Sequence, residues 1–396
     1  MASKLRVQVI VHAGVRLMSG LLSFYLFGLI ARMYPAGQVK HVYFFLFVFG
    51  FAATALRTLG NVSAGLDPSR TRTANLRRVQ TAMGEVALSC VAVVPGAMWL
   101  LAAHVEHPPL LLPAALILAV AAIDADMLRG LLRRDPMFSI AFGAGSALSV
   151  CLLLALPGAS SDLAVTALLL QWLPVCSVNV GLIARVLRKS LRRAWGRLRQ
   201  DGSILLVLTF VALFDGSVLN LPFFLGTALS VESGLEIAIV IRLFSASLVF
   251  FPLVLHWSNS DALRRLAASF SIPSTLAYLV LQFGAAVLCG SAFAAAFYLI
   301  AQKPVSLAQM LAFYALVASY CVYATAARFA GARQSTSVLA LLLAAAVAGL
   351  WGAVLLLVAG PGLSALSIAA LQCLALLCGA GLIWYRAERA GTFGGR

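Results

Sequence analysis

Charged residues are scarce in this sequence. Only 11% of its 396 residues are charged, whereas hydrophobic residues make up 62%. An ordinary soluble domain has about a quarter of its residues charged, so this composition excludes one. Runs of about 20 mostly apolar residues, long enough to cross a bilayer as helices, recur along the whole chain between short polar breaks. The sequence therefore predicts an integral membrane protein.

The sequence also lacks the usual marks of catalysis, cofactor binding and metal binding. Asp124 and Asp126 are two positions apart and cannot share a helix face as a catalytic pair needs. The stretch Gly143–Ser146 lacks the strand, third glycine and acidic residue of a dinucleotide fingerprint. The stretch His104–His107 offers two imidazoles and a carboxylate, but metal sites draw three or four ligands from spaced positions. We therefore expect no catalytic residue, no cofactor and no metal.

Apolar runs divide the chain into about twelve predicted membrane spans. The first six lie near Val9–Ala31, Val39–Leu59, Thr81–Ala103, Leu110–Leu128, Met137–Leu156 and Leu163–Ile183. The others lie near Ser203–Phe223, Ile237–Trp257, Ile272–Leu299, Leu307–Ala327, Val338–Val358 and Leu363–Tyr385. The predicted fold class is an all-α polytopic membrane protein with two pseudo-symmetric bundles of six helices.

Basic residues are unevenly distributed between the predicted loops. With the N-terminus inside, the inner segments hold nearly all of them, and only Arg32, Lys40 and Lys303 fall outside. Cytoplasmic loops of membrane proteins are enriched in Lys and Arg, so both termini are predicted to be cytoplasmic. The net charge of +16 is then explained by the basic residues of the cytoplasmic loops, which set the orientation of the protein in the membrane. A nucleic-acid partner is not expected, because nucleic-acid binders display basic residues on a water-facing domain surface.

The longest inner segment, Arg185–Asp201, separates the predicted spans into two sets of six. We assign residues 1–190 to an N-terminal bundle, 191–202 to a basic cytoplasmic linker and 203–396 to a C-terminal bundle. Two pseudo-symmetric halves are a recurrent plan of transporters. The segment is either a solvated linker or an amphipathic helix on the inner membrane surface. Its apolar residues at helical spacing are Leu187, Leu191, Trp195 and Leu198.

Three arginines, Arg16, Arg57 and Arg242, lie within apolar spans or at their inner margins. An arginine at a helix centre costs roughly 2.5–3.5 kcal/mol on insertion, so it usually faces a polar cavity or a partner. We therefore treat the three as candidate substrate-binding cations of a cavity. The alternative for each is snorkelling of the side chain to a nearby interface.

Other polar residues in the spans are candidates for the same cavity. In the first span His12, Ser19 and Ser23 share one helical face with Arg16 and are expected to line it. Asp215 is the most deeply placed carboxylate, and Glu85 lies near the inner end of the third span. Asp215 is expected to pair with an arginine, to take up a coupling proton or to make a structural hydrogen bond, and Glu85 is a second candidate for coupling or ion pairing.

Short motifs in both halves point to a family. They are Arg16-Leu17 with Gly20, the run Leu128–Arg134, Phe214-Asp215, Arg242-Leu243 and Phe251-Pro252. They resemble the polysaccharide or O-antigen flippases (Wzx type) of the multidrug/oligosaccharidyl-lipid/polysaccharide exporter superfamily. In span count and division into halves, the resemblance covers nearly the whole chain.

The resemblance implies a V-shaped pair of six-helix bundles, like that of the multidrug exporters. It implies alternating access that moves an undecaprenyl-pyrophosphate-linked oligosaccharide across the bacterial inner membrane. Cationic cavity residues on helices 1, 2 and 8 are typical of such flippases, and Arg16, Arg57 and Arg242 occupy similar places. The implied partners are the lipid-linked oligosaccharide, membrane lipid, a coupling proton or sodium ion, and polysaccharide polymerase and assembly proteins.

Two other classes stay open as alternatives. A major-facilitator or multidrug secondary transporter also has about twelve spans, but Gly65–Arg70 does not reproduce the major-facilitator signature after span 2. A membrane-embedded polymerase or glycosyltransferase usually presents carboxylates or a sizeable outer loop, whereas the predicted outer loops have about ten residues or fewer. We therefore predict a transporter and not an enzyme.

Overall fold

A computed structural model gives the fold of the chain. It describes residues 2–34, 36–64, 72–102, 108–123, 137–156, 160–200, 209–210, 212–214, 216–217, 220–221, 224, 239–240, 243–244, 272–301, 305–330, 346–347, 349–354 and 365–389. Within these ranges every regular element is a helix and none is a strand. The predicted all-α class is therefore confirmed.

Most of the predicted spans that the structure describes fall on one helix each. The N-terminal half contains α1 (Ala2–Met33), α2 (Ala36–Ala64), α3 (Arg72–Ala102), η1 (Pro108–Leu110), α4 (Leu111–Ala122), α6 (Met137–Ala155), α7 (Ser161–Leu170) and α8 (Leu173–Gln200). The C-terminal half contains α13 (Ile272–Ala301), α14 (Leu307–Ala330) and α16 (Ala365–Arg389). Short helical stretches are also described within 209–224, 239–244 and 346–354.

Several of these helices are apolar enough for a bilayer. Gln38–Gly60 and Thr73–Ala102 are each long enough to cross a membrane and have a mean hydropathy of 1.8, and the bent pair of α7 and α8 makes a third span if it is counted as one. Shorter apolar stretches lie in α1, α4, α6, α13, α14 and α16. The helices indicate a membrane protein, while the count of about twelve spans stays a prediction.

Local sequence explains where two helices begin. Before α14, the backbone N–H of Ser306 donates to Gln309 Oε1 at 2.7 Å and the N–H of Gln309 donates to Ser306 Oγ at 3.2 Å, which is a capping box. Between α7 and α8, Pro174 has no N–H to donate to the carbonyl of Leu170, and its ring clashes with a continuing helix. The predicted span Leu163–Ile183 is therefore broken, and the two helices meet at a bend of 42°.

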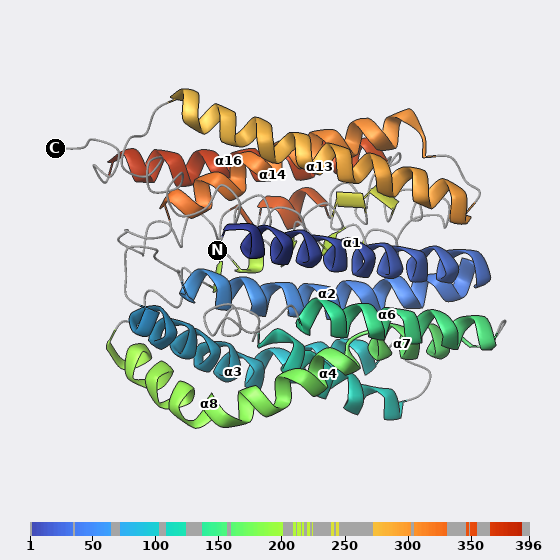
Figure 1. Ribbon diagram of the computed structural model, residues 1–396, viewed down its shortest axis with the longest axis horizontal. Coiled ribbons are helices and arrows are strands. Elements are labelled where there is room, and N and C mark those ends of the chain that lie inside the picture. The colour runs from blue at the N-terminus through green and yellow to red at the C-terminus, as the bar shows by residue number, and fades with distance from the viewer. Residues whose placement is uncertain are drawn as a thin grey trace.

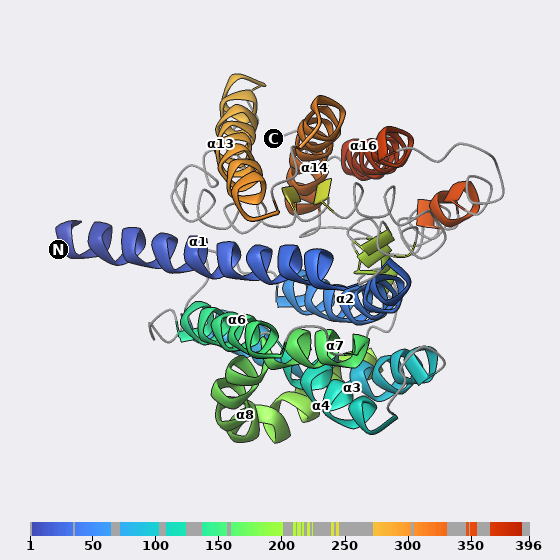
Figure 2. The same ribbon diagram turned by 90° about the vertical axis from the view of Figure 1, so that its right-hand side faces the viewer.

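The helices form two groups with α1 and α2 between them. Figures 1 and 2 show α3, α4, α6, α7 and α8 on one side of α1 and α2, and α13, α14 and α16 on the other. The packing agrees with this view, because α1 contacts both α6 and α13. Helix α2 contacts α3 and α4 on one side, and its Phe47 contacts Phe224 and Trp351 of the C-terminal half on the other. The first two helices are thus shared between the group from the N-terminal half and the group from the C-terminal half.

The contact between the two halves, which we call the seam, is largely aromatic. Phe24 on α1 lies 5.8 Å from Phe293 on α13, measured between ring centroids. Phe47 on α2 lies 5.1 Å from Phe224 and 6.0 Å from Trp351. Ring contacts of this kind contribute about 0.5–1.5 kcal/mol each beyond their buried area. Among the described residues, those that meet at the seam include Gly20, Phe24, Phe47, Gly50, Phe51, Thr54, Gly216, Asn220, Phe224, Phe293 and Trp351.

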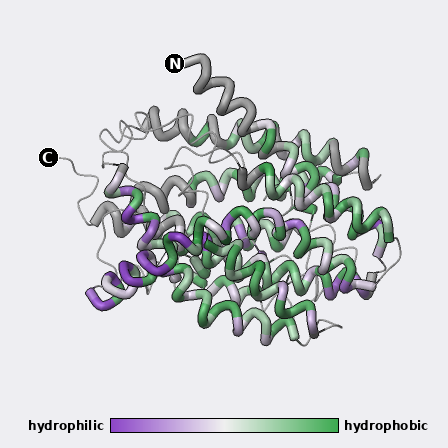
Figure 3. The backbone as a smooth tube through the Cα atoms, turned by 60° about the horizontal axis from the view of Figure 1, so that its bottom comes forward, coloured by the Kyte–Doolittle hydropathy of each residue, from purple (hydrophilic) through white to green (hydrophobic). Residues whose placement is uncertain are grey.

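The basic segment that we assigned to a linker is helical. Residues 191–200 continue α8 without a break from Leu173, and Ser190 and Ala194 are fully buried. Helix α8 packs along α3, so the solvated-linker alternative does not describe this stretch up to Gln200. Figure 3 shows its strongly hydrophilic end at the lower left, beside the hydrophobic middle of the other helices.

Candidate functional site

Four of the predicted cavity residues, His12, Arg16, Ser19 and Ser23, lie on α1, and two others fall outside the described residues. Arg16 and His12 are part of the helical backbone of α1. Asp215 and Arg242 lie outside the part of the chain that the structure describes. The expectation that Arg242 shares a cavity with Arg16 therefore stays a prediction.

Ser19 packs between α1 and α6. Its side chain is 5% exposed, and its hydroxyl donates to the carbonyl oxygen of Val15 at 2.8 Å. A Cβ added to Gly143 on α6 would lie 2.8 Å from Ser19 Oγ, so the glycine leaves room for the serine. Ser23, the next predicted residue on this face, is half-buried. The structure thus places Ser19 in a helix contact.

Arg57 binds the C-terminal end of α4. Its Nε and Nη2 donate to the carbonyl oxygen of Ala121 at 3.1 and 3.2 Å, and its guanidinium lies 4.5 Å from the centroid of the Trp172 ring. Carbonyls in the last turn of a helix have no partner within the helix, and a cation there is favoured by the helix dipole. Arg57 therefore joins α2, the end of α4 and the turn between α7 and α8.

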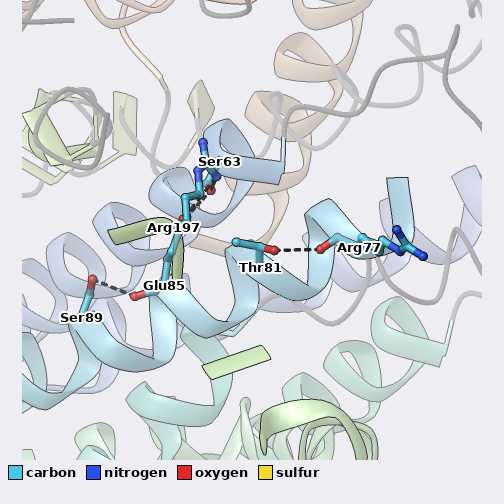
Figure 4. Close-up of polar contacts among 6 residues, drawn as sticks. All are labelled: Ser63, Arg77, Thr81, Glu85, Ser89 and Arg197. Carbon is cyan, nitrogen blue, oxygen red and sulfur yellow. Dashed lines mark hydrogen bonds and ion pairs between the residues drawn. The ribbon is translucent and has the colours of Figure 1, made fainter. Parts of the chain in front are cut away.

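Glu85 forms the centre of a polar cluster. Its carboxylate is 3% exposed, and Arg197 Nη1 lies 3.2 Å from Glu85 Oε1 in an ion pair. The hydroxyl of Ser63 donates to Glu85 Oε2, and Arg197 Nη1 also donates to Ser63 Oγ at 3.0 Å. Figure 4 shows Arg197 reaching Ser63 and Glu85. We call Ser63, Glu85 and Arg197 the carboxylate cluster, and it joins the ends of α2 and α8 to α3.

Close approach of α3 and α8 accompanies the carboxylate cluster. A Cβ on Gly84 would overlap the backbone carbonyl of Ser190 and would lie 2.9 Å from the Cβ of Ala194. Beside this contact, Arg193 Nη1 donates to Gln80 Oε1. Because glycine lets the two backbones meet, Arg197 reaches a carboxylate that is nearly sealed from solvent. A carboxylate buried in this way is costly unless a cation and hydrogen bonds compensate it.

These contacts leave only weak signals in the sequence. Arg197 is separated from Glu85 by 112 residues and from Ser63 by 134, and it falls in the segment that the sequence assigns to a linker. Helical spacing in Arg185–Arg199 was the available signal for α8, but spacing does not say which helix it packs against. Trp172 beside Arg57 was likewise unpredicted, since it lies in the turn that splits the sixth span.

Comparison with known proteins does not add a family. No family model, curated protein or solved structure matches this chain. Within the described residues, no group of three or more His, Cys, Asp or Glu side chains is arranged to hold a metal ion. The arrangement that the structure does show is electrostatic: a half-buried arginine on a helix end, and a buried carboxylate compensated by a second arginine.

Proposed function

We propose that this protein is a multi-pass transporter of the bacterial inner membrane. Its substrate is an undecaprenyl-pyrophosphate-linked oligosaccharide, which it moves across the membrane by alternating access for cell-surface polysaccharide synthesis. In this proposal about twelve spans form two bundles of six, and both termini are cytoplasmic.

The observation that carries the proposal is the seam between the two halves. Alternating access requires two groups of helices that change their contact without breaking either group. Ring contacts such as Phe24 with Phe293 and Phe47 with Phe224 are individually weak. A hydrogen bond from Asn220 Nδ2 to Thr54 Oγ1, at 3.3 Å, also crosses the seam. Such contacts support relative motion of the halves.

Polar contacts within the N-terminal half are of a different kind. The ion pair of Glu85 with Arg197 and the bonds of Arg57 to Ala121 join helices on the same side of the seam. Buried charged contacts are costly to break, so this group of helices is expected to move as one body. A rigid body beside a seam of apolar ring contacts, which can repack without leaving a charge unpaired, supports a rocking motion.

Arginine chemistry supports the choice of substrate. A lipid pyrophosphate leaving the headgroup region needs counter-charge, and arginine offers two parallel N–H donors to phosphate oxygens at any physiological pH. We assign this role to Arg16 and Arg242. Arg57 is assigned a structural role, because its donors already bind the carbonyl of Ala121.

The test is complementation of a strain that lacks its polysaccharide flippase. Arg16→Ala and Arg242→Ala should each abolish complementation at near-normal membrane abundance, since removal of a charge from a span does not hurt insertion. Arg→Lys should keep partial activity at most, because lysine keeps the charge but lacks the two parallel N–H donors of arginine. Arg32→Ala is the matched control on α1, because Arg32 is exposed at its end. Full activity of both alanine variants at equal expression overturns the proposal.

A further inference from the structure

The second half of α8 carries many cations and no carboxylate. Two of these cations bind polar side chains of α3, Arg193 that of Gln80 and Arg197 that of Glu85. The others lie in solvent-exposed positions on the helix. The seven cations of α8 are Arg185, Arg188, Lys189, Arg192, Arg193, Arg197 and Arg199.

Four of the exposed arginines form one stripe. At about 100° per residue, Arg185, Arg188, Arg192 and Arg199 fall within about 60° of one another around the helix axis. The buried Ser190 and Ala194 lie on the side that packs on α3, roughly opposite. We call these four residues the arginine stripe. It points away from the helix group that holds α8 in place.

An apolar line runs along α8 beside the arginine stripe. Its members in the first half, Leu173 and Val180, are 49% and 50% exposed. In the second half Leu187, Leu191 and Leu198 are half-buried, and Trp195 is 54% exposed with the Arg199 guanidinium 5.6 Å from its ring centroid. A helix that exposes apolar residues first and then arginines with a tryptophan is typical of the place where a membrane meets water.

We propose that the arginine stripe binds the headgroups of anionic phospholipids at the membrane surface, with Trp195 at the boundary between headgroups and acyl chains. The charges are complementary, and the apolar line continues from the membrane part of α8 directly beside the stripe. A soluble acidic protein or a nucleic acid matches the charges but not this continuous apolar line. The inference requires a membrane at this end of the protein and does not depend on the transported substrate.

The test is native mass spectrometry of the purified full chain in detergent with added phosphatidylglycerol or phosphatidylcholine. The wild type should retain phosphatidylglycerol in preference, and the preference should weaken as salt rises. Each cation near an anionic surface contributes roughly fivefold to affinity, so Arg188→Gln with Arg192→Gln should weaken phosphatidylglycerol binding about 25-fold. The matched control removes two cations elsewhere, by Arg32→Gln with Lys40→Gln, and should keep wild-type binding.

Three results overturn the proposal. The first is equal retention of phosphatidylglycerol by the stripe variant, the control variant and the wild type. The second is equal retention of phosphatidylglycerol and phosphatidylcholine by the wild type. The third is binding of a single-stranded oligonucleotide as tight as that of phosphatidylglycerol and with the same loss in the stripe variant, which would assign the stripe to polyanions in general. A lower thermal stability of the stripe variant without lipid identifies misfolding, and Arg185→Gln with Arg199→Gln then repeats the test.

Discussion

Arg197 Nη1 and Glu85 Oε1 lie 3.2 Å apart although 112 residues separate them in the chain. The two partners differ in burial, because the Glu85 side chain is 3% exposed and that of Arg197 is 34% exposed. Losing the arginine therefore leaves a buried carboxylate without its cation, while losing the carboxylate leaves a cation that water can reach. This asymmetry makes the pair testable by single substitutions.

Arg197→Gln should destabilise the protein more than Glu85→Gln. We expect a loss of about 2 kcal/mol for Arg197→Gln, because a buried charged group keeps its desolvation cost when its partner is removed. The double variant should be more stable than Arg197→Gln alone. Thermal unfolding of the purified protein in detergent measures all three. Equal losses in the two single variants would contradict the assigned burial asymmetry.

Gly84→Ala should loosen α8 from α3. The added Cβ would overlap the backbone carbonyl of Ser190, and such overpacking typically costs about 1–3 kcal/mol. Gly96→Ala is the matched control, since it lies in the same helix and its Cβ would have no atom within 4 Å. Thermal unfolding should separate the two variants clearly. Similar melting temperatures would show that the close approach of the two helices does not constrain the fold.

Arg57→Gln should reduce stability without a specific effect on transport. The substitution removes the cation from the end of α4 and from the face of Trp172, and each contact is worth about 0.5–1 kcal/mol. Transport activity per folded molecule should stay near that of the wild type. The measurement pairs a melting curve with an activity assay normalised to folded protein. A normal melting temperature with lost transport would show that Arg57 binds the substrate and would contradict its structural role.

The predicted topology can be mapped by single-cysteine labelling in whole cells. The charge distribution predicts that Ser69, Lys189 and the C-terminal tail are cytoplasmic, and that His107 and Ser160 are periplasmic. A cysteine at each position is reacted with a membrane-impermeant reagent before and after permeabilisation, in a background without reactive native thiols. With the N-terminus cytoplasmic, a periplasmic C-terminal tail would show that the number of spans is odd and would contradict the prediction of twelve.

Helix positions could be predicted because an apolar run is a local property of sequence. The run Ile272–Leu299 coincides with α13, and Leu307–Ala327 with α14. The break before α8 was missed although Pro174 stands in the predicted span, because a proline kinks some membrane helices and ends others. For the basic segment, composition could not decide between a helix and a solvated linker, since the small residues Ser190 and Ala194 that pack against α3 are outnumbered by cations.

Pairing of charged residues could not be predicted in the same way. Glu85 was a candidate from its place in a span, but its partner depends on how α8 lies on α3, which no local pattern encodes. For Arg57 the sequence position suggested a role that its contacts do not support. Its position near the inner end of a span fitted a cavity residue, and the structure places its donors on a helix end. Asp215 and Arg242 stay predictions outside the described residues.

The unbroken length of α8 has a mechanical consequence. Its 28 residues form a rigid rod of about 42 Å, with one end at the proline break after α7. A rotation of only about 5° at that break would displace the far end by about 4 Å. Because Arg197 near that end is bound to Glu85 on α3, such a rotation would carry α3 with it, so α8 acts as a strut that passes a displacement at the break to its whole helix group.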